Sequence, residues 1–377
     1  MGVVGKQALR RWLVVAAAAA VAVALPPLVG ALPARGGPVG AEDLRQRILG
    51  SAGQPYQGYA ESTGRLGIPD LPQLSDVTKL LNSTVHLRAW YAGPDRWRVD
   101  EIGLAGAERD LYRTWPGLEY VWDYGANVLT QIIGDPPLRL PRPADLVPPE
   151  LARRLLTVAA GDPVSSLPAR RVAGVDAAGL RLTPADAETT IGAVDVWADP
   201  ASGLPLQVEV TGRGGSSPVL SSRFLDVAQR APAEGTLQPH LPAGAAYDST
   251  ETPDLASAVG TFGFGVLPES LAGRARRPLP DGFDAVGVYG GGLSAFVVLP
   301  LPRGLGGAAL AGLRDAGGAT VPLPGDGTAV AFATPLLSVL VARFQGVRRT
   351  YLLAGLDSPA LLTRAVTELD GRIRVVP

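Results

Sequence analysis

Hydrophobic and polar residues alternate along much of the chain, and this alternation predicts short β-strands. Between residues 56 and 133, six runs rich in Val, Ile, Tyr, Trp and Thr are separated by Gly, Pro, Asp or Asn. The runs are YQGYAESTGRLGI, TVHLRAWYA, RWRVDEIG, ERDLYRTW, LEYVWDYG and VLTQII. Strands of this length in direct succession predict an antiparallel meander.

Two segments show helical spacing instead. AEDLRQRIL places Leu44 and Ile48 four residues apart behind acidic residues, which predicts a short amphipathic helix before the meander. PPELARRLL begins with two prolines and places Leu151, Leu155 and Leu156 along one edge, which predicts a crossover helix after the meander.

Strands resume after the crossover, in ARRVAGVDA, GLRLTPA, IGAVDVWADPASGLPLQVEVTG and SSRFLDVAQ. DPASG separates two alternating runs and predicts a hairpin turn. Two sets of strands, with one helix before them and one between them, predict a mainly β fold. We expect a half-open antiparallel barrel with a helical lid.

From about residue 253 the pattern changes again. LGGAALAGLRDAGG predicts a helix, TAVAFATPLLSVLVARFQGVRRTYLLAG two or three strands, and SPALLTRAVTEL a last helix with Ser358 and Pro359 at its first positions. This order predicts a small α+β addition. The expected divisions are residues 1–34, a linker at 35–41, a half-barrel domain at 42–250 and a small C-terminal domain at 255–377.

The first 34 residues carry an export pattern. Lys6, Arg10 and Arg11 precede an uncharged apolar stretch at 12–34, which places positive charge on the cytoplasmic side. Small residues at 29–31 suit a signal-peptidase site, yet the stretch is also close to the roughly 20 residues that span a bilayer. Cleaved signal peptide and retained anchor both stay open. In either case we expect the remainder on the extracytoplasmic face of the membrane.

Composition removes several classes of function. The chain of 377 residues has a net charge of −1, without the basic excess that binds nucleic acid, and it has no cysteine and two histidines. Disulfides, thiolate nucleophiles and His-rich metal sites are therefore not expected. GGLSAF around Ser294 lacks the second glycine of a nucleophile elbow, and the Gly-rich stretches fail the phosphate-loop pattern. We expect neither enzymatic activity nor a cofactor.

Aromatic residues at alternate positions are the strongest candidate feature, and they have two interpretations. They pack the core of a sandwich, or they line a concave wall that holds acyl chains, whose burial is worth roughly 0.8 kcal/mol per methylene. On the second interpretation the predicted lining is Leu87, Tyr91, Trp97, Val99, Tyr120, Trp122 and Tyr124, with Leu151 and Leu155 in the lid. A strand parity shifted by one would exchange Leu87 and Tyr91 for His86 and Trp90.

The order of these segments resembles the LolA-like lipoprotein-carrier superfamily, which also supplies the large domain of RseB-type periplasmic regulators. The segments that carry the resemblance lie within about residues 42–250: YQGYAE, LRAWYAGPDRWRVD, DLYRTWPGLEYVWDYGANVLTQI, LRLTPA, VDVWADPASGLPLQVEV and LQPHLPAGAAYD. From about Leu267, LPDGF and YGGGLSAFVV resemble the small C-terminal domain of RseB-type regulators. The resemblance implies an unclosed β-barrel with a helical lid over a hydrophobic cavity for acyl chains or lipoproteins.

One position departs from the carrier pattern. Pro94 matches the family's proline, but Gly93 stands where the carriers have a lid-latching arginine, which favours a relative that only binds or senses. We therefore expect a non-enzymatic protein that binds acyl chains of lipids or lipoproteins. The alternative is an RseB-like regulator that binds a membrane anti-sigma factor, or another membrane-anchored partner such as a transporter. A third hypothesis is a structural envelope domain with a filled core.

Overall fold

The computed structural model describes residues 39–69, 75–103, 106–135, 139–251, 265–279, 285–324, 327–345, 349–370, 372 and 374–375. The predicted export segment at 1–34 lies outside these residues. None of the helices within the described ranges combines the length and apolar character needed to cross a bilayer.

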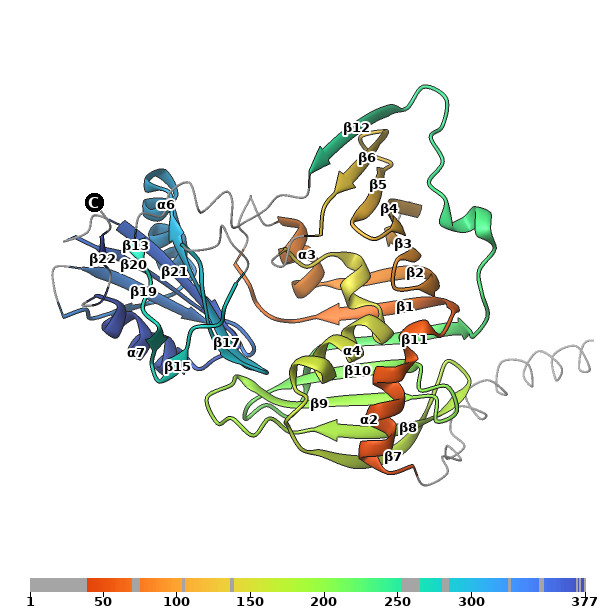
Figure 1. Cartoon of the computed structure of the whole chain (residues 1–377), viewed down its shortest axis with the longest axis horizontal. Coiled ribbons are helices and arrows are strands. Elements are labelled where there is room, and N and C mark those ends of the chain that lie inside the picture. Colours follow the sequence, from red (N-terminus) through yellow and green to blue (C-terminus); the bar gives the residue numbers. More distant parts are fainter. Residues whose placement is uncertain are drawn as a thin grey trace, which may run out of the picture.

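Most of the described chain builds one twelve-stranded sheet (Figure 1). Its spatial order is β12-β6-β5-β4-β3-β2-β1-β11-β10-β9-β8-β7. The strands are β1 (Tyr56–Gly64), β2 (Thr84–Gly93), β3 (Arg96–Gly103), β4 (Gly106–Trp115), β5 (Leu118–Asp123), β6 (Val128–Ile133), β7 (Val164–Val172), β8 (Val175–Leu182), β9 (Ile191–Ala198), β10 (Pro205–Gly212), β11 (Pro218–Ala228) and β12 (Ala246–Glu251).

Two antiparallel meanders, β1–β6 and β7–β11, join where β1 pairs with β11. The outermost strands, β12 and β7, do not pair with each other, so the sheet stays open. The predicted half-open antiparallel barrel is confirmed. The parallel pairing of β12 with β6 was not predicted.

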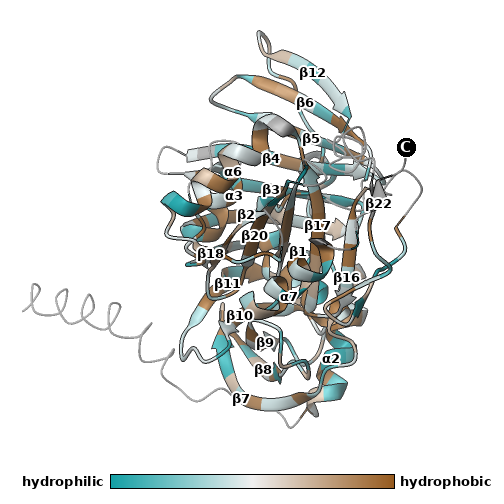
Figure 2. Ribbon diagram, turned by 90° about the vertical axis from the view of Figure 1, so that its left-hand side faces the viewer, coloured by the Kyte–Doolittle hydropathy of each residue, from teal (hydrophilic) through white to brown (hydrophobic). Residues whose placement is uncertain are grey.

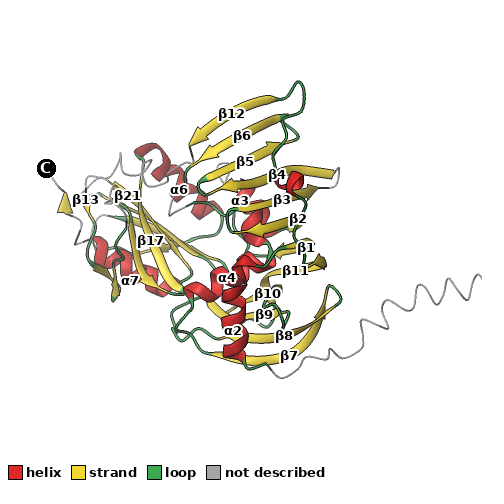
Figure 3. Cartoon of the chain, turned by 45° about the vertical axis from the view of Figure 1, so that its right-hand side comes forward, coloured by secondary structure: helices red, strands yellow, loops and turns green. Residues whose placement is uncertain are grey.

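Helices cover one face of this sheet, which we call the inner face (Figure 3). They are α2 (Ala41–Gly50), the short turns η1 (Ser51–Gly53) and η3 (Pro143–Leu146), and α4 (Pro148–Val158). Leu44, Ile48 and Leu156 are fully buried against inward residues of β8–β11. Both predicted helices are thus confirmed, and a third, α3 (Ser75–Asn82), was missed.

Hydrogen bonds from one arginine join α2 to α4. The Arg45 guanidinium donates to the carbonyl oxygens of Ala159 at 2.7 Å and Asp162 at 2.9 Å, immediately beyond the end of α4. Both carbonyls lie just past the C-terminal end of α4, where a buried cation interacts favourably with the negative end of the helix dipole. Arg45 therefore fixes the position of the lid helix.

The predicted DPASG turn is also confirmed between β9 and β10. Gly203 has φ of +72°, and a Cβ there would lie 2.4 Å from the carbonyl oxygen of Arg47 on α2. Only glycine allows both this backbone conformation and this close approach.

The C-terminal part of the chain forms a second, six-stranded antiparallel sheet with its own hydrophobic clusters. In spatial order its strands are β16 (Gly287–Gly291), β17 (Ser294–Leu301), β21 (Arg349–Gly355), β20 (Ser338–Phe344), β19 (Thr328–Ala333) and β18 (Ala319–Val321). Two small pairs accompany it, β13 (Gly265–Val266) with β22 (Arg374–Val375) and β14 (Ser270–Leu271) with β15 (Arg274–Ala275). Figure 2 shows hydrophobic residues along the strands of both sheets.

Helices α6 (Arg303–Asp315) and α7 (Pro359–Asp370) pack on opposite faces of the second sheet, because Val341 contacts the α6 cluster and its neighbour Leu340 the α7 cluster. Ser358 caps α7 as predicted, accepting a hydrogen bond from the Leu361 amide at 3.1 Å. The predicted α+β addition is confirmed.

Polar contacts join the second sheet to the segment before β9. The Glu188 carboxylate accepts a hydrogen bond from Ser358 at 2.5 Å, and Asp186 pairs with Arg274 at 2.6 Å. These contacts dock the second sheet beside the lower half of the large one (Figure 1).

The packing of α4 yields a stability prediction. Leu156→Ala should lower the free energy of unfolding by about 3 kcal/mol, since it leaves a cavity under the lid helix. Val158→Ala, on the same helix but exposed, should change it by less than about 0.5 kcal/mol. Urea denaturation of both variants measures the difference, and equal effects would contradict the described packing.

Candidate functional site

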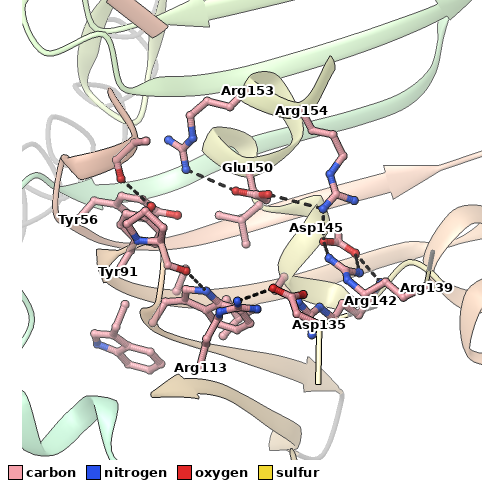
Figure 4. A pocket seen from close by; sticks show the side chains of 18 residues that line it. Tyr56, Tyr91, Arg113, Asp135, Arg139, Arg142, Asp145, Glu150, Arg153 and Arg154 are labelled. Carbon is pink, nitrogen blue, oxygen red and sulfur yellow. Dashed lines mark hydrogen bonds and ion pairs between the residues drawn. The ribbon is translucent and has the colours of Figure 1, made fainter. Parts of the chain in front are cut away.

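A cavity of about 260 Å³ lies on the inner face, between β2–β3 and the η3–α4 segment (Figure 4). One part of its lining is apolar or aromatic: Ala52, Tyr56, Ala89, Trp90, Tyr91, Pro94, Trp97, Val99, Ala144 and Val147. The other part is charged: Arg113, Asp135, Arg139, Arg142, Asp145, Glu150, Arg153 and Arg154. The cavity is therefore amphipathic, and the charges come mainly from the lid side.

Aromatic rings form its apolar part. The rings of Tyr56 and Tyr91 stack with centroids 5.0 Å apart and planes 11° from parallel. The Tyr91 hydroxyl donates to the carbonyl oxygen of Ala52 at 2.6 Å, and the Trp97 indole N–H donates to that of Pro94 at 3.1 Å. Burial raises the pKa of both tyrosines, so they stay neutral. The polar ends of Tyr91 and Trp97 are therefore satisfied within the protein.

Ion pairs organise the charged part. Arg113 donates to Asp95 at 3.1 Å, to Glu119 at 2.9 Å and to Asp135 at 2.8 Å. Arg142 pairs with the other oxygen of Glu119, and its guanidinium lies 5.5 Å from the centroid of the Trp97 ring. The network thereby joins the charged part to the aromatic part.

Asp145 anchors the segment that precedes the lid. Arg139 contacts both of its oxygens at 2.6 Å, and Arg154 of α4 lies 3.2 Å away. Burial opposes ionisation of Asp145, but the ion pair with Arg139 and the nearby Arg154 outweigh it and hold its pKa below the ordinary value. The carboxylate stays charged, and a bidentate pair of this kind fixes the geometry of η3 and α4.

The structure places three of the predicted lining residues, Tyr91, Trp97 and Val99, on the cavity wall. Leu87 points to the same inner face but is fully buried in the core. The strand parity is the one predicted, since Leu87, Ala89 and Tyr91 alternate inward.

The prediction that Tyr120, Trp122 and Tyr124 share this wall is wrong. In the strand register, Val99 pairs with Leu111 and Leu111 with Val121, so Val121 is the residue of β5 that faces inward. Trp122 instead packs on the outer face with Tyr112 and Leu129. Period two within a strand gives the set of residues that share a face, but only the pairing between strands decides which face.

The two lid residues predicted from helical spacing lie in the core beneath α4 and do not line the cavity. Leu151 is buried and Leu155 is partly buried, both against the core under α4. The α4 residues on the cavity wall are instead Glu150, Arg153 and Arg154. The cavity side of the lid is charged, because the leucine edge of α4 faces the sheet.

Sequence reasoning did not find the arginines of this site or Tyr56. A signal was present, since PPELARRLL places two arginines between leucines in a segment that must cover a sheet. Arg153 is 7% exposed, as a buried position in such a segment would require.

The outer face carries a second polar cluster. Arg98 donates to Asp100 at 2.6 and 2.8 Å and to Asp110 at 2.8 Å, between the rings of Trp90 and Tyr112. Asp100 and Asp110 pair directly across β3 and β4. Two buried carboxylates thus share one arginine.

Within the described ranges, no group of three or more His, Asp or Glu side chains is arranged to hold a metal ion. The carboxylates at the cavity are held in ion pairs. The arrangement can bind an amphipathic molecule, with its apolar part against the rings and its polar part against the arginines.

Comparisons with known proteins support the fold. No family model matches the chain, and no curated protein does. The solved complex of MucA and MucB from Pseudomonas aeruginosa contains a chain that is 19% identical, with a TM-score of 0.50. The match covers 89% of this chain and 99% of that one. The fold is that of MucB.

MucB solved alone is also 19% identical, with a TM-score of 0.44, 89% of this chain covered and 98% of MucB. A LolA superfamily protein from Nitrosomonas europaea is 11% identical with a TM-score of 0.24, over 54% of this chain and 99% of its own. The MucB-like fold spans both sheets, and the expected likeness to RseB-type proteins is confirmed at the level of the fold.

The outer cluster yields a pH prediction. Burial raises the pKa of Asp100 to about 7, against the hydrogen bonds from Arg98, and the facing Asp110 adds to the rise. The folded protein therefore holds a proton that the unfolded chain releases near pH ~3.9. This stabilising contribution is complete below that pH and is lost as the pH rises through about 7.

We expect the free energy of unfolding to fall by about 2 kcal/mol between pH 5 and pH 8, and Asp100→Asn to remove most of this decrease. Asp226 is an exposed carboxylate on β11, so the control substitution Asp226→Asn should leave this decrease unchanged. Denaturation curves across this pH range measure both. A slope that Asp100→Asn leaves unchanged would assign the effect to another group.

Proposed function

We propose that this protein is a non-enzymatic binding protein outside the cytoplasm that takes acyl chains of lipids or lipoproteins into its half-barrel. The observation that carries the proposal is the cavity beneath α4, with the stacked rings of Tyr56 and Tyr91 on its wall. The MucB-like fold and the export pattern at residues 1–34 support the extracytoplasmic location.

The cavity is too small for a whole acyl chain, so the proposed function requires the lid helix α4 to move. Helix α2 packs on β7 and β8 and helix α4 on β10 and β11, and the cavity of about 260 Å³ lies just below the roughly 300–1,000 Å³ of typical ligand pockets. The end of a chain fits this space, whereas a whole acyl chain requires α4 to move away from β2 and β3. The filled-core hypothesis therefore applies to the β8–β11 half, where Leu44, Ile48 and Leu156 are fully buried.

Filling the cavity tests this function. Ala52 lies on its wall and is only partly buried, so Ala52→Phe should occupy the space with little strain elsewhere. We expect binding of a fluorescent fatty acid to weaken by at least tenfold, because the added ring takes the place of several methylenes, each worth roughly 0.8 kcal/mol.

Ala126→Phe is the matched control, since Ala126 is exposed in the turn between β5 and β6. It should bind the probe as the unaltered protein does. Equal binding by both variants, or no lipid on protein recovered from the cell envelope by native mass spectrometry, would count against the acyl-chain function.

A second function is favoured by one specific comparison. MucB has been solved in complex with MucA, and the present chain shares its fold across both sheets. We propose as the alternative that this protein is a regulator that binds a membrane-anchored partner. Cross-linking in the host envelope should then recover one single-span membrane protein reproducibly. Recovery of none, with lipid still bound, would favour a carrier.

A further inference from the structure

The guanidinium of Arg153 is buried at the cavity without a hydrogen-bond acceptor. Its side chain is 9% exposed, and neither Nη1 nor Nη2 donates a hydrogen bond to any residue that the structure describes. Its one carboxylate neighbour is Glu150 of the same helix, at 3.5 Å and 41% exposed. The guanidinium instead lies 5.6 Å from the centroid of the Tyr91 ring, which faces the cavity (Figure 4).

The other arginines of the wall have carboxylate partners. Arg113 and Arg142 share Glu119, while Arg139 and Arg154 share Asp145. These pairs use the acidic groups nearest to the cavity, so no further carboxylate of the described residues reaches Arg153. Arg142 keeps one buried donor, Nε, without an acceptor. Unused donors of two arginines thus belong to residues of the same cavity wall.

A buried cation with unused donors is unfavourable unless a ligand or water completes it. The planar guanidinium presents paired N–H groups that match the oxygens of a phosphate, and it lies over the Tyr91 ring. The two free Nη groups of Arg153 suit an oxyanion such as a phosphate, two of whose oxygens can accept hydrogen bonds from them.

We propose that Arg153 forms a binding subsite for a phosphate group at the charged side of the cavity. A phosphate there lies beside the Tyr56 and Tyr91 rings, so a phosphate-bearing amphiphile places its polar end on Arg153 and its chain on the aromatic part. The role of the chain rests on the proposed function, whereas the phosphate subsite stands on Arg153 alone.

Calorimetric titration of the exported protein with three probes tests the subsite: octyl phosphate, neutral octyl glucoside and inorganic phosphate. We expect octyl phosphate to bind at least tenfold more tightly than octyl glucoside. Arg153→Met should remove this advantage while leaving the affinity for octyl glucoside unchanged, because the methionine keeps the apolar contact with Tyr91 but not the donors.

Two further variants make the result specific. Arg153→Lys keeps the charge without the planar fork and should retain only part of the advantage, and it also serves if Arg153→Met folds poorly. Arg181→Met removes an arginine of β8 that pairs with Asp195 of β9 and does not line the cavity, and this variant should bind all three probes normally.

Equal affinity of the unaltered protein and Arg153→Met for octyl phosphate would overturn the subsite, as would an equal loss for octyl glucoside. Arg153-dependent binding of inorganic phosphate without binding of either octyl compound would support the subsite and contradict the acyl-chain function. Binding of both octyl compounds with no effect of Arg153→Met would support the acyl-chain function and contradict the subsite.

Discussion

The fold depends on how α4 is held against the inner face of an open sheet. A twelve-stranded sheet whose edges do not meet leaves the side chains of its inner face without partners, and α2 and α4 supply them through residues such as Leu44 and Leu156. Apolar burial alone sets no precise position along the sheet. The hydrogen bonds from Arg45 to the carbonyls beyond α4 add direction and fix the end of the lid. The lid is therefore anchored at one end and meets the cavity through Glu150, Arg153 and Arg154.

This arrangement explains why the cavity is amphipathic. The leucine edge of α4 faces the sheet, so the next positions around the helix face the space over β2 and β3, and two of them are arginines. Burying arginines is unfavourable unless they are paired, and Glu119 and Asp145 provide pairs for four of the five on this wall. These ion pairs hold η3 and α4 near the aromatic part, so the position of both segments depends on the charges of Glu119 and Asp145. A ligand able to replace one ion pair would therefore loosen the lid without disturbing the buried leucines.

The sequence predicted the elements better than the site, and the reason lies in what each depends on. Leu44, Leu151 and the DPASG turn carry local patterns, so their helices and hairpin were predicted correctly. Tyr91 and Trp97 were placed on the cavity because each belongs to an alternating strand next to a tight turn. Trp122 was misplaced because its face is set by the pairing of β4 with β5, which periodicity within one strand does not contain. Arg153 was missed because its lack of a hydrogen-bond acceptor depends on other elements, whose carboxylates are already paired with other arginines.

The same distinction bears on the departure at Gly93. The resemblance to carriers associates that position with an arginine on the sheet that latches the lid, and here the residue before Pro94 has no side chain. The segment just beyond α4 nevertheless accepts hydrogen bonds from an arginine of α2, Arg45, at the end of the lid opposite to Glu150. An anchor between two helices does not have to break when a ligand enters between α4 and β2.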